Sequence, residues 1–103
     1  MLLFKKKFLD AIRSGDKTQT IRLWKHRRMK VGQRSYIPGV GAIRITAVDV
    51  IELSDLTEED ARRDGFESAA VLRQEIDRIY ADDSDAQHRQ PYRVRFERMK
   101  EDT

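Results

Sequence analysis

Residues 15–22 read GDKTQTIR and carry the side chains in this chain that are best suited to catalysis. The hydroxyl of Thr20 is a weak nucleophile at neutral pH and needs a base beside it. Lys17 can be that base if burial or a neighbouring cation lowers the pKa of its amine and leaves it partly neutral. A carboxylate from elsewhere in the chain could then orient the amine or donate a proton to a leaving group. Together these residue types would support nucleophilic catalysis.

The same segment has a plainer interpretation. Lys17 can be an exposed lysine and Thr20 a cross-strand threonine, because strict alternation along a strand puts the two side chains on opposite faces. The two converge only if Asp16 and Lys17 lie in the turn before the strand. Residue types alone favour the plainer interpretation.

Metal and other catalytic sites have little support. His26 and His88 are the only histidines, they are far apart in sequence, and the chain has no cysteine. No spacing typical of metal ligands occurs. The nucleophile motif GxSxG and a phosphate-binding glycine loop are also missing. We therefore expect no metal site and no cofactor.

Positive charge is concentrated in one part of the chain. Residues 17–48 contain eight basic residues and no acidic one, whereas residues 49–87 contain thirteen acidic residues and four arginines. Such a basic stretch favours a phosphate-bearing partner such as RNA, although it can also be a solvated surface without a partner. The candidate ligand-binding side chains are these basic groups and two aromatic residues that could stack on a base: Arg22, Trp24, Lys25, Arg27, Arg28, Arg34, Tyr36 and Arg44. Trp24 can instead be a core or rim residue.

Periodicity and turn signals predict the elements that position these side chains. The expected order is a first strand or edge segment at 1–4, a helix at 5–14, strands at 18–24, 34–37 and 41–53, helices at 57–65 and 68–80, and a strand at 92–98. Gly15 occupies the position of a left-handed helix cap. Residues 57–60 fit a variant of the capping box, and the helix that they begin is expected to end at Gly65. Within the long strand the apolar side chains change from one face to the other, which predicts a bulge or bend near Asp49.

These elements predict an α+β fold, because the helices do not alternate regularly with the strands. We expect one domain over residues 1–103, with a small curled sheet, helices on one side, and a flexible tail at 99–103. No apolar run approaches the roughly 18 residues of a membrane helix, and the first residues do not form a secretory signal. The chain is therefore predicted to be a soluble, cytoplasmic protein, and its oligomeric state is not indicated.

Residues 15–22 resemble the GxKxxTxR motif of ASCH domains, small proteins of the PUA-like superfamily that are related to RNA-binding PUA modules. The resemblance covers about residues 3–98, including LTEEDA at 56–61 and DGF at 64–66. It implies a PUA-like β-barrel of about five strands with helices packed on one side. It also implies a cleft, lined by the motif, that binds RNA or a modified nucleoside or nucleotide.

One bacterial branch of similar length hydrolyses the acyl amide of N4-acetylcytidine. The resemblance places its catalytic lysine and threonine on Lys17 and Thr20, and its glutamate position on Asp64, which is one methylene shorter. Two functions follow. The first is binding of RNA or a nucleoside in a basic cleft, which tolerates the change to Asp64 and uses the basic stretch. The second is an amidohydrolase in which Thr20 attacks, Lys17 is the base, and Arg22 or backbone amides stabilise the oxyanion.

Overall fold

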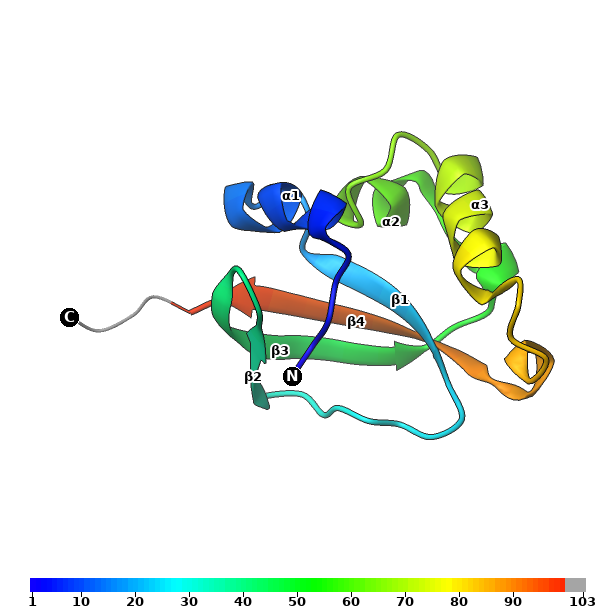
Figure 1. The fold of residues 1–103 in the computed structure, drawn as a ribbon, viewed down its shortest axis with the longest axis horizontal. Helices are drawn as coiled ribbons and strands as arrows, with labels where there is room; N and C mark the ends of the chain where they lie inside the picture. Colours follow the sequence, from blue (N-terminus) through cyan, green and yellow to red (C-terminus); the bar gives the residue numbers. More distant parts are fainter. Residues whose placement is uncertain (100–103) are drawn as a thin grey trace.

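The computed structural model describes residues 1–99 and contains a four-stranded antiparallel sheet in the order β1-β4-β3-β2 (Figure 1). The elements, with η marking 3-10 helices, are η1 (Lys6–Phe8), α1 (Leu9–Ser14), β1 (Gln19–Trp24), β2 (Arg34–Ile37), β3 (Gly41–Val50), η2 (Leu53–Asp55), α2 (Glu58–Arg63), α3 (Ala69–Tyr80), η3 (Ala86–His88) and β4 (Gln90–Arg98). None of the helices in the described residues is long and apolar enough to cross a membrane.

The expected α+β fold is confirmed, with the α-helices on one side of the strands in Figure 1. The sheet has four strands and is not closed into a barrel, because β1 and β2 remain at its opposite edges. The first residues do not add a fifth strand. Leu2 donates its N–H to the carbonyl of Tyr36 at 2.9 Å, and the chain then enters η1. One hydrogen bond of this kind ties the segment to the edge of β2 without forming a ladder.

The sheet contains the irregularity that the slip of hydrophobic phase predicted, at a slightly earlier position. The pairing of β3 with β4 changes register between Ile45 and Ala47, before the expected site at Asp49. At the far end of the same pairing, the N–H of Met99 donates to the carbonyl of Ala42 at 3.0 Å. The rest of the predicted flexible tail, residues 100–103, lies outside the described residues.

Two hydrophobic clusters hold the fold together. The larger one joins the sheet to the N-terminal segment and to α1, and contains Leu2, Ile12, Trp24, Met29, Ile37, Ile43, Ile45, Val94 and Phe96. The smaller one joins β1 to α2 and α3, and contains Ile21, Leu23, Leu56, Ala61, Leu72 and Ile76. Strand β1 contributes to both clusters, so side chains on both of its faces are buried.

Local signals at the ends of two helices position the residues of interest. Gly15 ends α1 with a positive φ of 88°, and the next turn places Lys17 just before β1. Helix α2 begins with the predicted capping box, in which Thr57 and Asp60 exchange backbone and side-chain hydrogen bonds. It ends with Asp64 at its C-cap position, followed by Gly65. Lys17 and Asp64 therefore both lie at helix ends, where short sequence signals determine the path of the chain.

Candidate functional site

A pocket of about 350 Å³ lies at the outer edge of β1. The N-terminal segment and α3 form much of its lining, together with the connection between α2 and α3. Its polar lining includes the three predicted catalytic residues, Lys17, Thr20 and Asp64, and the predicted binding residue Arg22. Most of the other lining residues are hydrophobic. The fold thus brings the four residues to one mainly apolar pocket.

Lys17 and Asp64 form a buried ion pair. Their exposed fractions are 3% and 2%, and the amine of Lys17 donates to both Oδ1 and the main-chain oxygen of Asp64 at 2.7 Å. The turn after Gly15 supports this geometry, since the N–H of Lys17 donates to the carbonyl of Ala11 at 3.0 Å. Lys17 therefore belongs to the turn and not to the strand, which removes the alternation that would separate it from Thr20.

Three phenyl rings surround the amine of Lys17. Its Nζ lies 5.7 Å from the ring centroid of Phe4, 5.0 Å from that of Phe8 and 5.5 Å from that of Phe66. Such rings attract a cation electrostatically and also keep water away from it. Sequence analysis did not select these rings. The only signal for them was a phenylalanine directly after Asp64 and Gly65, and a second one on the apolar face of the first helix.

The environment moves both members of the pair toward their neutral forms. Burial lowers the pKa of Lys17 below its usual value, although the charge and hydrogen bond of Asp64 oppose this shift. Burial also raises the pKa of Asp64, against the opposing charge and hydrogen bonds of Lys17 and Gln19. Desolvation penalises each charged form, so the proton affinities of the two groups lie closer together than in water. The pair is consequently suited to accepting and returning a proton.

Thr20 lies beside a cation. Its buried Oγ1 accepts a hydrogen bond from Nε of Arg22 at 3.1 Å. The guanidinium of Arg22 also donates to the carbonyl of Leu3 at 2.6 Å and lies 4.7 Å from the ring centroid of Phe4. Arg22 therefore joins the N-terminal segment to β1 and places positive charge next to the Thr20 oxygen. Such a charge stabilises negative charge that develops on or near the hydroxyl.

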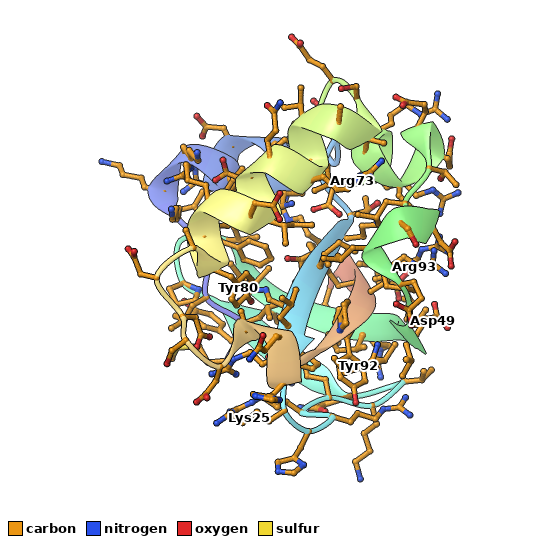
Figure 2. The ribbon with its side chains drawn as sticks, turned by 90° about the vertical axis from the view of Figure 1, so that its right-hand side faces the viewer. Lys25, Asp49, Arg73, Tyr80, Tyr92 and Arg93 are labelled. Atoms are coloured by element: carbon orange, nitrogen blue, oxygen red, sulfur yellow. The ribbon has the colours of Figure 1, made fainter. Side chains whose placement is uncertain are left out.

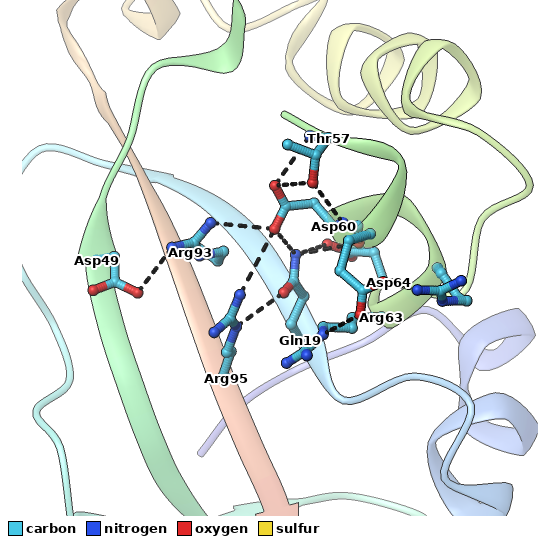
Figure 3. A network of polar contacts seen from close by, with 10 residues as sticks. Gln19, Asp49, Thr57, Asp60, Arg63, Asp64, Arg93 and Arg95 are labelled. Carbon is cyan, nitrogen blue, oxygen red and sulfur yellow. Dashed lines mark hydrogen bonds and ion pairs between the residues drawn. The ribbon is translucent and has the colours of Figure 1, made fainter. Parts of the chain in front are cut away.

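A polar network behind the pocket holds the second oxygen of Asp64 (Figure 3). The fully buried amide of Gln19 donates to Oδ2 of Asp64 at 3.1 Å and to Oδ1 of Asp60 at 3.3 Å. Its own oxygen accepts from Nε of Arg95 at 3.3 Å, and Asp60 also accepts from Arg93 at 3.2 Å. Sequence analysis missed Gln19 as part of the site and gave Asp60 only a capping role, since nothing local connects them to Asp64.

Asp60 and Asp64 are both buried, yet their pKa values move in opposite directions. Burial alone raises the pKa of Asp60, but hydrogen bonds from the backbone N–H of Thr57, from Gln19 and from the Thr57 hydroxyl hold it below its usual range. The nearby charge of Arg93 acts in the same direction. The surroundings therefore favour the ionised form of Asp60, whereas burial favours the protonated form of Asp64.

The remaining predicted binding residues do not line the pocket. Trp24 belongs to the larger hydrophobic cluster, with its ring 5.3 Å from that of Tyr92. It therefore has the core position that the sequence left open as an alternative to stacking. The other residues are exposed and lie outside the pocket: Lys25, Arg27, Arg28, Arg34, Tyr36 and Arg44.

These exposed residues already have contacts of their own. Lys25 pairs with Asp85 at 3.1 Å, and Arg44 donates to the carbonyl of Gly32 at 3.1 Å. Figure 2 shows Lys25 low in the view, away from α2 and from the start of α3. The exposed basic residues from Lys25 onward and the motif therefore do not form one basic cleft. They belong to separate parts of the surface, one exposed and basic, the other a mainly apolar pocket.

No protein-family model matches the sequence, and comparison with curated proteins finds no match. Several solved structures are similar in fold. The ASCH domain from Lactobacillus crispatus JV V101 aligns with a TM-score of 0.73 at 17% identity, over 86% of this chain and 68% of that one. EF3133 from Enterococcus faecalis V583 aligns at 0.69 and 20% identity, over 88% and 69%. PF0455 from Pyrococcus furiosus aligns at 0.67 and 20% identity, over 96% of both chains.

Proposed function

We propose that this chain, which has the fold of an ASCH domain, is a small amidohydrolase that removes the acyl group from an N4-acylated cytidine such as N4-acetylcytidine. The observation that carries the proposal is the buried Lys17–Asp64 pair in the same pocket as the Thr20 hydroxyl. The lowered pKa of Lys17 supports it, because a base must be partly neutral to accept a proton. Fold alone would not carry this inference, since one fold hosts many functions.

In the first step, Oγ1 of Thr20 attacks the acyl carbon of the amide while the neutral amine of Lys17 accepts the hydroxyl proton. A tetrahedral intermediate forms, and its oxygen gains negative charge. Arg22 donates to Thr20 Oγ1 and so lies close to this charge. A fixed cation in an apolar pocket stabilises the transition state, because little water competes with it.

In the second step, the intermediate collapses and the bond between the acyl carbon and N4 breaks. The leaving amine takes its proton from the Lys17 ammonium or from the carboxyl of Asp64, because the raised pKa of Asp64 favours the protonated form that a proton donor needs. Water then hydrolyses the ester on Thr20 and regenerates the hydroxyl. The net reaction consumes the amide and one water and yields cytidine and a carboxylic acid.

The side chain of Asp64 is shorter than that of glutamate, but its position in the fold still brings its carboxylate to Lys17. Asp64 contacts the amine of Lys17 with a side-chain and a main-chain oxygen, both at 2.7 Å. The C-cap position of α2 brings the backbone itself to the amine, so the missing methylene does not leave a gap. This favours catalysis over binding alone.

The test is incubation of the purified protein with N4-acetylcytidine, with cytidine and acetate measured by chromatography. We expect turnover by the wild type and none by Thr20→Ala or Lys17→Ala. Thr18→Ala is the matched control, because Thr18 belongs to the same motif but does not line the pocket. No turnover by the wild type, or equal turnover by the Thr20 and Lys17 variants, removes the mechanism.

RNA binding is the second candidate, and the observation that favours it is the exposed basic surface outside the pocket. Its members include Arg27, Arg28, Arg34 and the half-exposed Tyr36, which could stack on a base. Binding of a single-stranded RNA oligonucleotide should weaken steeply with salt, with a logarithmic slope of about −0.7 per phosphate contact. Affinity that hardly changes between low and moderate salt contradicts this candidate.

A further inference from the structure

Strand β1 has an edge that no other strand covers. It pairs with β4 on one side only. In an antiparallel sheet, alternate residues direct both their N–H and their C=O to the same side. The pairing register and one hydrogen bond set this alternation: Leu23 stands opposite Pro91, which has no N–H, and the N–H of Leu23 donates away from β4 to the hydroxyl of Tyr80 at 3.1 Å. The N–H and C=O of Ile21 therefore point away from β4.

Ile21 lies on this edge in the wall of the pocket, with 6% of its surface exposed. The other residues whose main-chain groups point to this side either have hydrogen-bond partners already or do not line the pocket. Lys17 donates to Ala11, Leu23 donates to Tyr80, and Gln19 does not line the pocket. Within residues 1–99, neither the N–H nor the C=O of Ile21 has a hydrogen-bond partner on this side of the strand. Buried backbone groups without a partner are rare, because the lost hydrogen bonds to water are costly.

We propose that the main chain of Ile21 is a recognition subsite for the edge of a nucleobase, an inference that rests on the proposed function and deepens it. In an antiparallel pair, opposite residues exchange two hydrogen bonds through adjacent donor and acceptor groups. A planar edge with a donor beside an acceptor can replace the opposite residue. Cytosine has such an edge: N3 accepts from the Ile21 N–H, and the N4 hydrogen donates to the Ile21 carbonyl. Acylation at N4 leaves one hydrogen there, so the substrate keeps both groups.

The surroundings select a small planar ligand over an extended peptide. A peptide that adds to a sheet edge needs several successive free groups. Here Tyr80 occupies the next group of the same phase beyond Ile21, so the free edge is too short for a strand. Hydrophobic side chains of the N-terminal segment and of α3, such as Phe4 and Ile76, also line the pocket. They provide apolar contacts for the faces of a ring.

The subsite also explains how the reacting group reaches the nucleophile. Ile21 directly follows Thr20, and the side chain of Thr20 lines the same pocket. A base held through its N4 hydrogen by the Ile21 carbonyl places the acyl group on N4 next to this part of the strand. Recognition of the base and attack on its acyl group would thus use consecutive residues, so positioning depends on one short segment of rigid strand.

The test uses the chain prepared by chemical synthesis with the peptide bond between Thr20 and Ile21 replaced by an ester. This change removes the N–H and keeps the side chain. The matched control is the same change at Leu23, whose N–H bonds to Tyr80 and which does not line the pocket. Each protein is titrated calorimetrically with cytidine and with N4,N4-dimethylcytidine, which lacks the N4 donor. Circular dichroism establishes that each protein is folded.

We expect the wild type to bind cytidine about tenfold more tightly than the dimethyl analogue, the range of one or two net hydrogen bonds. The ester at Ile21 should weaken cytidine binding by a similar factor, and the ester at Leu23 should leave it unchanged. Equal cytidine binding by the Ile21 ester and the wild type overturns the subsite, while the proposed function stands if N4-acetylcytidine is still hydrolysed. If the wild type neither binds cytidine nor hydrolyses N4-acetylcytidine, both proposals fail.

Discussion

The substitution Lys17→Met tests how far the pair with Asp64 is removed from water. It removes the amine and keeps most of the side-chain length. The Asp64 carboxylate then loses a charged donor at 2.7 Å and keeps Gln19 at 3.1 Å as a hydrogen-bond donor. Breaking a buried ion pair on one side costs about 3–5 kcal/mol, because a charge is left without its partner. We therefore expect a loss of this size, a large part of the 5–15 kcal/mol that typically stabilises a domain.

Removing both charges should cost far less. In the double variant Lys17→Met with Asp64→Leu, neither charge of the pair is left without its partner. Replacing a buried pair by hydrophobic residues is often neutral or stabilising. The free energy of unfolding of the double variant should therefore exceed that of Lys17→Met by about 3 kcal/mol or more. The coupling energy of the pair is obtained from urea denaturation followed by circular dichroism. The proteins compared are the wild type, Lys17→Met, Asp64→Leu and the double variant.

The sign of the pH dependence follows from the directions of the two pKa shifts. The pKa of Asp64 is raised in the folded state, so its contribution to stability is fully present below the unfolded value of 3.8 and is lost as pH rises through the folded value. Lys17 has a lowered pKa, so its contribution is present above 10.5 and is lost as pH falls through its folded value. Without Lys17, the pKa of Asp64 rises further. The cost of Lys17→Met should consequently be smaller near pH 4 than near pH 8.

An opposite result would refute this reasoning. A loss below about 1 kcal/mol that does not change with pH is typical of a surface ion pair. It would mean that water reaches the amine despite Phe4, Phe8 and Phe66, and that the pKa of Lys17 is not lowered. The case for Lys17 as a neutral base would then lose its physical basis.

Three further predictions concern the same site. Lys17→Arg should abolish hydrolysis of N4-acetylcytidine while the protein stays folded, because arginine cannot become neutral; measurable turnover by this variant would exclude Lys17 as the base. Asp64→Glu should lower the free energy of unfolding by about 1–3 kcal/mol in urea denaturation, because an added methylene displaces the carboxylate from its contacts with Lys17 and Gln19. A more stable variant would show that the longer side chain keeps both contacts. Thr57→Ala should lower the free energy of unfolding by about 0.5–2 kcal/mol through loss of the capping box of α2. It should also raise the pKa of Asp60, whose carboxylate accepts hydrogen bonds from the Thr57 backbone N–H and hydroxyl. An Asp60 pKa that is unchanged in an NMR titration would contradict this second expectation.

Short-range signals account for what the sequence determined by itself. Apolar periodicity placed the helices and strands, the Thr57 capping box marked the start of α2, and Gly15 and Gly65 marked the ends of helices. These features depend on neighbours within a few residues, so they can be read along the chain. The motif at 15–22 also led by resemblance to the ASCH-domain fold, which similar structures support.

Tertiary structure alone decided which side chains meet. Lys17 and Asp64 are 47 positions apart, and the rings around the amine come from the N-terminal segment and from Phe66, close to Asp64 in the chain. The packing of these segments removes water from the amine and moves its pKa, an effect that no local pattern contains. The same long-range packing buried Trp24 and left the basic residues from Lys25 to Arg44 outside the pocket. The pairing of β1 with a single neighbour then left the Ile21 main chain facing the pocket, a consequence of strand order and not of residue type.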